Sequence, residues 1–339
     1  MLNVLLFLGL AAVGTGVTWV GSTWLERASE RIGVHYGLPP VVQGAIVAAV
    51  GSSFPELSSV LLSVLVHGEF ELGVAAIVGS AVFNILIIPA AAGLSGDIGL
   101  TADRDLVYKE AQFYMLSVAT LFLAFAFAVI YYPTETGTAL RGTMTPLLAL
   151  IPLALYGLYI FNQYQDTNDY DASHHERSTN IGRRWLELIA GLAVILVGVE
   201  MLVVSAIELG DALGTPSFVW GLTVIAAGTS LPDTVVSVQA ARGGRDSTSL
   251  ANVFGSNIFD LLVAVPLGVV VGGAVEINFS RAAPMMAFLV FATVVLFTLM
   301  RTDMNVSGRE AWLLLGLYAL FVVWLVLEEL GVTTLVKGG

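Results

Sequence analysis

Two carboxylates lie inside apolar stretches of this chain, and each ends a ten-residue phrase that occurs twice. Residues 47–56 read VAAVGSSFPE and end at Glu56, and residues 224–233 read VIAAGTSLPD and end at Asp233. An ionised side chain at the centre of a membrane helix costs about 2.5–3.5 kcal/mol even on lenient insertion scales. Two acids that occur in matched positions despite this cost indicate a site that handles ions.

A second phrase follows each copy and adds further polar side chains. Residues 79–84 read GSAVFN, and residues 255–260 read GSNIFD. In both copies, a serine and an amide or acid are four residues apart, so they share one face of a helix. The second phrase therefore extends the candidate site onto a neighbouring span in each half of the chain.

All of these groups offer oxygen atoms to an ion, and none of the four phrases contains His or Cys. Glu56 and Asp233 each follow a proline, which cannot donate a backbone hydrogen bond and disturbs the preceding turn, so nearby carbonyls should be freed. Oxygen-only sites select hard cations such as Ca²⁺, Mg²⁺ or Na⁺. The candidate ligands are the side chains of Glu56, Asp233, Asn84, Asp260, Ser52, Ser53, Thr229, Ser230, Ser80 and Ser256, and the carbonyl groups of Ala49 and Ala226.

The two matched acids suit Ca²⁺, which takes six to eight oxygen ligands in flexible geometry. Glu56 and Asp233 would supply up to four oxygens and two negative charges. When Ca²⁺ leaves, the stranded anions must take up monovalent cations or protons, which would make exchange obligatory. Asp260 adds a third acid, which would be protonated or would hold another monovalent ion.

The composition indicates a membrane protein. Hydrophobic residues make up 57% of the chain, charged residues only 12%, and the mean hydropathy is +0.86. Soluble domains are about 25% charged. The apolar start has no Lys or Arg before Arg27, so we expect a retained span rather than a signal peptide. We predict an all-α membrane protein with ten transmembrane helices, at roughly 2–22, 40–66, 72–96, 107–131, 144–162, 185–208, 216–241, 247–272, 283–300 and 311–329.

The spans divide into two halves of five. We predict a first repeat at 1–162, a cytoplasmic central loop at 163–184 and a second repeat at 185–339. Residues 37–56 and 214–233 align with an offset of 177 and share nine of twenty residues. Because five is odd, the second repeat must enter the membrane from the opposite side. Inverted repeats with broken helices, here expected in spans 2 and 7, place transport sites at the midplane.

The distribution of cations predicts the orientation. With the N-terminus outside, all Lys and Arg residues except Arg141, Arg281 and Lys337 fall on the cytoplasmic side. Cytoplasmic loops carry an excess of Lys and Arg. We therefore expect a multi-pass protein of the cell membrane with both termini extracellular.

The phrases resemble the repeats of the calcium/cation antiporter superfamily, which includes the sodium/calcium exchangers. The resemblance rests on GSAVFNIL at 79–86 and on AAGTSLPD at 226–233 followed by GSNIFD. It implies that Glu56 and Asp233 are the main Ca²⁺ ligands, and that nearby hydroxyls and carbonyls help to bind Na⁺. Asp233 and the run GSNIFD also resemble the potassium-dependent branch, which raises K⁺ coupling as an option.

We therefore expect a secondary antiporter that exchanges Na⁺ for Ca²⁺ by alternating access, with K⁺ coupling open. Proton/Ca²⁺ exchange in the same fold is the alternative, and a cation channel is the less favoured one. We expect no enzyme activity, because the chain has no nucleophile–base pair and no phosphate-binding loop. We expect no cofactor and no nucleic-acid partner; inorganic cations and lipid are the partners, and one chain should suffice for transport. The role of Glu200, an acid in the sixth span, stays open.

Overall fold

The computed structural model describes most of the chain. It covers residues 2–36, 49–96, 99–102, 104, 106–134, 140–165 and 180–333. Within these ranges, nine helices are long and apolar enough to cross a membrane, and Phe54–Leu65 is a shorter apolar helix. The start of the predicted second span and most of the predicted central loop lie outside the described residues. The described part is that of an all-α membrane protein.

The first half of the chain contributes six helices, a π-helical segment and two short strands to the described residues. They are α1 (Leu2–His35), α3 (Ala49–Ser52), α4 (Phe54–Leu65), α5 (Phe70–Ser95), β1 (Leu100–Thr101), the π-helical η2 (Leu106–Glu110), α6 (Ala111–Tyr131), β2 (Arg141–Met144) and α7 (Pro146–Gln165).

The second half is built from similar pieces. They are α8 (Ile181–Leu213), α9 (Ser217–Trp220), the π-helical η3 (Gly221–Ile225), α10 (Ala226–Arg242), α11 (Asp246–Phe259), the π-helical η4 (Asp260–Ala264), α12 (Val265–Gly272), β3 (Val275–Asn278), α13 (Phe279–Arg301), β4 (Asn305–Val306) and α14 (Gly308–Glu329).

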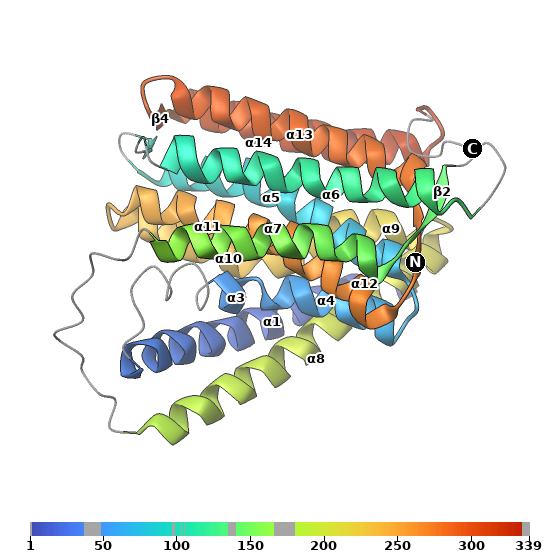
Figure 1. Ribbon diagram of the computed structural model, residues 1–339, viewed down its shortest axis with the longest axis horizontal. Helices are drawn as coiled ribbons and strands as arrows, with labels where there is room; N and C mark the ends of the chain where they lie inside the picture. Colours follow the sequence, from blue (N-terminus) through green and yellow to red (C-terminus); the bar gives the residue numbers. More distant parts are fainter. Residues whose placement is uncertain are drawn as a thin grey trace.

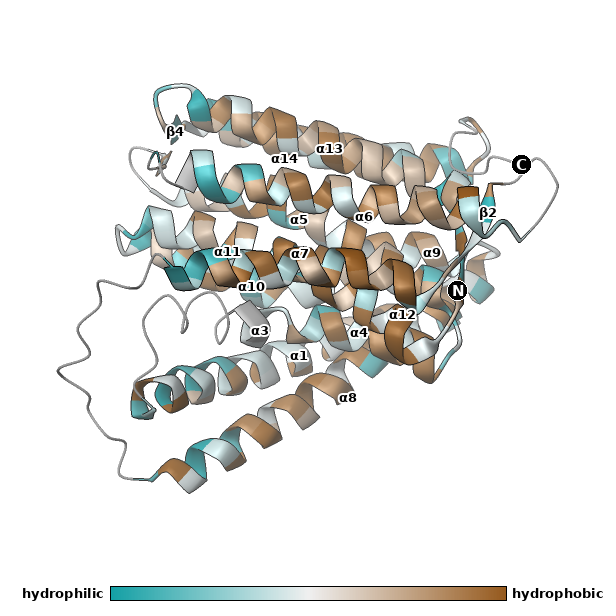
Figure 2. Ribbon diagram, viewed as in Figure 1, coloured by the Kyte–Doolittle hydropathy of each residue, from teal (hydrophilic) through white to brown (hydrophobic). Residues whose placement is uncertain are grey.

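The helices lie side by side in one bundle, with α1 beginning and α14 ending at the same end of it (Figure 1). Two spans are central: 89% of the apolar window of Phe70–Ser95 and 83% of that of Asp246–Gly272 are buried, against 17% for Pro146–Gln165. Apolar residues line the lengths of the helices, and polar residues concentrate near their ends (Figure 2). Both central spans carry the second phrase, so that phrase lies in the interior of the bundle.

Helices α1 and α8 form one side of the bundle and touch through glycine (Figure 1). A Cβ atom on Gly14 of α1 would lie 2.8 Å from the carbonyl oxygen of Gly198 in α8, and one on Gly21 would lie 3.0 Å from that of Gly191. Small residues allow such close backbone approach between membrane helices. Because the later glycine of α1 meets the earlier glycine of α8, the two helices run antiparallel.

Helix α1 is longer than the predicted span, which ended at residue 22. It continues to His35 because its buried stripe continues: Leu25, Ala28 and Ile32 are all buried. Spacings of three and four residues place side chains on one helical face. The charged residues between them mark the end of the apolar segment, but they do not end the helix.

Two short antiparallel strand pairs connect the halves at the two ends of the bundle. β1 pairs with β4 through Leu100 and Val306, and β2 pairs with β3 from Arg141 opposite Asn278 to Met144 opposite Val275. Each pair joins a loop of the first half to a loop of the second half.

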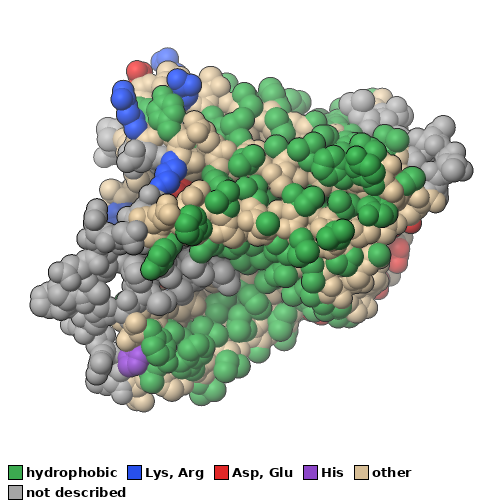
Figure 3. Space-filling view, in the orientation of Figure 1, with side chains coloured by type: hydrophobic (Ala, Val, Ile, Leu, Met, Phe, Trp, Pro, Cys, Tyr) green, Lys and Arg blue, Asp and Glu red, His purple; other side chains and the backbone are tan. Residues whose placement is uncertain are grey.

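The visible Lys and Arg side chains gather at one end of the molecule, where α13 ends and α14 begins (Figure 3). The sides of the bundle in this view are mainly hydrophobic. Such a surface suits a protein surrounded by lipid, with its cations kept at the water boundary.

Candidate functional site: buried acids from both halves

Glu56 lies at a helix start in the interior of the bundle. Helix α3 ends at Ser52, Ser53 forms a turn, and α4 begins at Phe54 with Pro55 in its first turn. Proline is tolerated there because the first N–H groups of a helix have no internal acceptor. Glu56 therefore occupies the first turn of α4, where the positive end of the helix dipole favours an anion.

The matching region of the second half is continuous, which differs from the predicted break. Residues 217–242 run through α9, η3 and α10 without interruption, and both Pro232 and Asp233 lie inside α10. The irregularity takes the form of a π-helical segment at Gly221–Ile225, which overlaps the first two residues of the phrase. In a π-helical turn the backbone hydrogen bonds span five residues instead of four, and single turns of this kind are frequent at functional sites.

Three carboxylates from the two halves are buried in the interior of the bundle and interact with one another. Glu56, Asp233 and Asp260 expose only 1%, 2% and 0% of their surface, and they interact electrostatically with each other. Both oxygens of Glu56, both of Asp260 and one of Asp233 have no hydrogen-bond partner among the described residues. Unpaired buried carboxylates are costly unless a cation or proton compensates them.

Serine hydroxyls join the two halves beside these acids. The hydroxyl oxygens of Ser80 and Ser230 are 2.7 Å apart, and those of Ser52 and Ser256 are 3.1 Å apart. Ser53 donates to the carbonyl oxygen of Ser256 at 3.4 Å. The first phrase of each half thus contacts the second phrase of the other half.

The hydroxyls also surround the carboxylates. Thr229, Ser80 and Ser230 lie around Glu56, whereas Ser256 faces Asp233 and Ser53 faces Asp260. Thr229 donates to the carbonyl oxygens of Ile225 and Ala226, at 3.1 and 3.3 Å. Five of the predicted hydroxyl groups, from both halves, therefore lie beside the acids, and Ala49, whose carbonyl was also predicted, begins α3.

Asn84 completes the set of predicted side chains. It is fully buried, its amide nitrogen donates to Asn257 at 3.0 Å, and its carbonyl oxygen has no partner among the described residues. This unpaired oxygen is therefore a candidate neutral ligand.

Acidic side chains alone do not form a metal cage in this arrangement. No group of three or more His, Cys, Asp or Glu side chains within the described ranges is placed to hold a metal ion. A cation bound here would need hydroxyl, amide or backbone oxygens in addition to the acids, and those groups are present. This mixture suits Ca²⁺ and Na⁺ better than metals that require several soft ligands.

Glu200, whose role the sequence left open, lies apart from the cluster. Its Oε1 atom is 2.9 Å from Nε2 of His67, which follows α4, and its side chain is 35% exposed. Its Oε2 atom is buried and has no partner among the described residues, but the contact with His67 and the exposure of the side chain indicate a peripheral position.

Three residues near the site were missed by the sequence analysis. Asn257 and Tyr114 extend the hydrogen bonds of Asn84 toward α6, and Glu26 of α1 interacts electrostatically with Asp233. Asn257 was detectable, because it replaces the apolar Ala81 of the matching phrase within a buried span. Glu26 carried no such signal, since it lies in a charged segment that was expected to leave the membrane.

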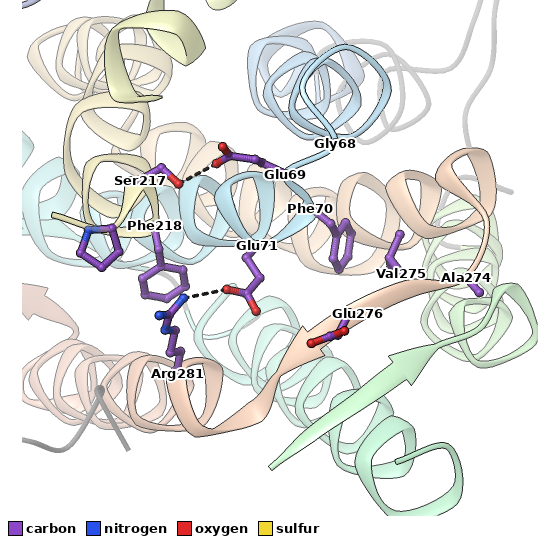
Figure 4. A pocket seen from close by; sticks show the side chains of 11 residues that line it. Gly68, Glu69, Phe70, Glu71, Ser217, Phe218, Ala274, Val275, Glu276 and Arg281 are labelled. Carbon is purple, nitrogen blue, oxygen red and sulfur yellow. Dashed lines mark hydrogen bonds and ion pairs between the residues drawn. The ribbon is translucent and has the colours of Figure 1, made fainter. Parts of the chain in front are cut away.

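A separate cavity of about 610 Å³ opens at the end of the bundle where α5 begins (Figure 4). Its acids are partly paired: Ser217 donates to Glu69 at 2.6 Å, and Arg281 donates to Glu71 at 3.0 Å. None of the twelve predicted ligands lines it. The cavity is thus distinct from the buried cluster.

Comparison with known proteins identifies relatives along almost the whole chain. The family model described as sodium/calcium exchanger protein matches residues 6–165 and 184–327. An uncharacterized membrane protein of Methanocaldococcus jannaschii is 30% identical over 78% of this chain and 82% of its own length. The sodium/calcium exchanger MaX1 of Methanosarcina acetivorans is 26% identical over 89% of this chain and 93% of its own.

The fold is similar to that of a solved exchanger. The structure of the sodium-calcium exchanger NCX_Mj soaked with Na⁺ and Sr²⁺ matches with a TM-score of 0.64 at 26% identity. The match covers 94% of this chain and 99% of that one.

Proposed function

Because the chain belongs to the sodium/calcium exchanger family, we propose that it is an antiporter that exchanges Na⁺ for Ca²⁺ by alternating access. The observation that carries the proposal is the interaction of three buried carboxylates from two halves, most of whose oxygens have no hydrogen-bond partner among the residues that the structure describes. A site of this kind is stable only when it holds cations or protons. That requirement is the physical basis of obligatory exchange.

In this proposal, Glu56 and Asp233 bind Ca²⁺ from opposite sides and balance its two charges. The free oxygen of Asn84 and the hydroxyls of Ser80 and Ser256 are candidates to complete the shell, since Ca²⁺ accepts mixed oxygen ligands. When Ca²⁺ leaves, Na⁺ ions occupy the same oxygens. Asp260 would bind a proton or an additional monovalent cation.

Alternating access would arise from two inverted five-helix repeats, with the site at their interface. The proposal is supported by reciprocal contacts: Gly14 meets Gly198 while Gly21 meets Gly191, and these glycines are related by the offset of 177. When two halves are related by a two-fold axis, a contact between two residues is repeated by their equivalents. Here the contact of Gly14 with Gly198 is repeated by that of Gly191 with Gly21. The strands show the same reciprocity: β1 and β2 of the first half pair with β4 and β3 of the second half.

K⁺ coupling is a second candidate feature of the same exchanger. The human sodium/potassium/calcium exchanger 4 is 33% identical over 45% of this chain, but the match covers 24% of that protein. Proton coupling competes with it, because three clustered acids would also accept protons. Both alternatives use the same site and differ in the ion that neutralises it.

Transport into proteoliposomes tests these assignments. The purified protein would be reconstituted and the uptake of radioactive Ca²⁺ measured under an imposed Na⁺, K⁺ or H⁺ gradient, one at a time. We expect a gradient of Na⁺ from inside to outside to drive Ca²⁺ inward. Uptake driven by a proton gradient alone would favour the proton exchanger, and flux that needs no counter-ion would reject exchange in favour of a channel.

A further inference from the structure

Asn257 is a buried amide that is not among the predicted ligands. It lies in α11, one residue after Ser256, and its side chain is fully buried. The matching position of the first half is Ala81, so the two phrases differ here in polarity. A buried amide must find hydrogen-bond partners, and its partners define what it does.

The orientation of the Asn257 amide is determined by a backbone group. Its nitrogen donates to the carbonyl oxygen of Ala81 at 3.2 Å and contacts the hydroxyl of Tyr114 at 3.4 Å. A peptide carbonyl can only accept a hydrogen bond, so the NH₂ group must face Ala81. The carbonyl oxygen of Asn257 consequently faces Asn84.

This orientation in turn determines how Asn84 is presented. The amide nitrogen of Asn84 donates to Oδ1 of Asn257 at 3.0 Å and lies 3.5 Å from the hydroxyl of Ser80. A flipped Asn84 would set two carbonyl oxygens against each other. Its Oδ1 atom is therefore held away from Asn257, buried and without a partner among the described residues.

We propose that Asn257 is a positioning residue that fixes Oδ1 of Asn84 as a ligand of the transported cation without touching the cation itself. This inference rests on the proposed function, because it gives Asn84 a role only if the cluster binds cations. Partners of this kind orient a ligand before the ion arrives, and replacing them typically lowers metal affinity by about 10–100-fold.

Asp260 is the residue of the second half that matches Asn84. Its chemistry explains why the first half has alanine, Ala81, at the position that matches Asn257. Asp260 is a carboxylate, and both of its oxygens accept. It presents an acceptor in either orientation, so no amide is required to orient it. The difference between Asn257 and Ala81 follows from the difference between Asn84 and Asp260.

The test compares Asn257→Ala and Asn257→Leu with the parent protein in proteoliposomes. Leucine has the same number and branching of side-chain heavy atoms as asparagine but no hydrogen-bonding group, so it provides a second test if the alanine variant does not fold. We expect the Ca²⁺ concentration for half-maximal uptake to rise about 10–100-fold, with the maximal rate within about two-fold of the parent. A Ca²⁺ titration of the melting temperature in detergent should shift in parallel, independently of transport.

Asn252→Ala is the matched control. Asn252 lies on the same helix and donates to the hydroxyl of Ser237 at 3.2 Å. We expect it to leave the half-maximal Ca²⁺ concentration unchanged. A parent protein that neither binds nor transports Ca²⁺ would reject the proposed function itself. A working parent combined with folded Asn257 variants of equal Ca²⁺ affinity, or with a reduced maximal rate alone, would overturn this inference only.

Discussion

The hydroxyl oxygens of Ser80 and Ser230 lie 2.7 Å apart beside Glu56, so one hydrogen bond joins the buried phrase of the first half to that of the second. The matched serines make the reverse connection, since Ser53 donates to the carbonyl oxygen of Ser256. A cation at this interface would draw its ligands from both halves. A change in either half should therefore alter the same site.

Glu56→Gln and Asp233→Asn should each lower Ca²⁺ uptake about 100-fold or more, because each removes one of the two charges that balance Ca²⁺. The melting temperature without Ca²⁺ should stay equal or rise, since a neutral amide is less costly to bury than an unpaired carboxylate. Uptake in proteoliposomes and thermal melting in detergent measure the two effects. A variant that folds and retains full uptake would remove that acid from the site.

Glu200→Gln is the matched control for these acids. Glu200 contacts His67 at a partly exposed position, and such pairs contribute little, about 0–1 kcal/mol. We expect uptake and melting temperature close to those of the parent. A loss as large as that of Glu56→Gln would place Glu200 in the transport path.

Asp260→Asn should change which monovalent ion supports exchange. The substitution gives the second half the amide that the first half already has at Asn84, and it removes the third charge of the cluster. We expect Ca²⁺ uptake to continue while its dependence on K⁺ or H⁺ changes, because Glu56 and Asp233 still balance Ca²⁺. The measurement is uptake across a series of K⁺ concentrations and pH values. An unaltered ion dependence would reject this role of Asp260.

Gly198→Val should lower the melting temperature and reduce transport. A Cβ atom at Gly198 would overlap Thr18 of α1 and approach the Gly14 carbonyl oxygen at 2.8 Å. Overpacking of a tight interface typically costs about 1–3 kcal/mol. Gly16→Val is the control, because a Cβ atom there has nothing within 4 Å. Equal melting temperatures for the two variants would show that the contact between α1 and α8 is not tight.

The orientation can be tested with single cysteines, since the chain has none. Thr134 follows α6 and Thr302 follows α13, and both are exposed. With the termini outside, a membrane-impermeant maleimide should label Thr134→Cys in intact cells, and Thr302→Cys only after permeabilisation. The reverse labelling pattern would invert the proposed orientation.

Much of the helical organisation could be predicted from the sequence. The third span was expected at 72–96 and is found at Phe70–Ser95, because membrane helices require long apolar segments. The end of α1 was predicted wrongly, because its last turns are held by a buried stripe among charged residues. Such a stripe is recognisable only when the packing partner is known.

Partners of individual polar side chains could not be predicted. Glu200 is an acid within an apolar span, which is typical of a functional residue. In the structure it contacts His67, more than a hundred residues away in the chain. Asn257 has the signal of a buried polar residue, but its role depends on Ala81 and Asn84 in the other half. Hydrogen-bond direction depends on donors and acceptors that only the folded chain brings together.

The amino-acid order alone determined the candidate chemistry of this protein: a duplicated phrase, acids in apolar spans, and candidate ligands that offer only oxygen atoms. These features follow from residue type and spacing, which are local properties. The packing of the two halves decided which acids meet, which hydroxyls accompany them, and which face of Asn84 is left free. Those outcomes require contacts between segments about 150–200 residues apart, and an unpaired buried oxygen becomes visible only when all of its neighbours are in place.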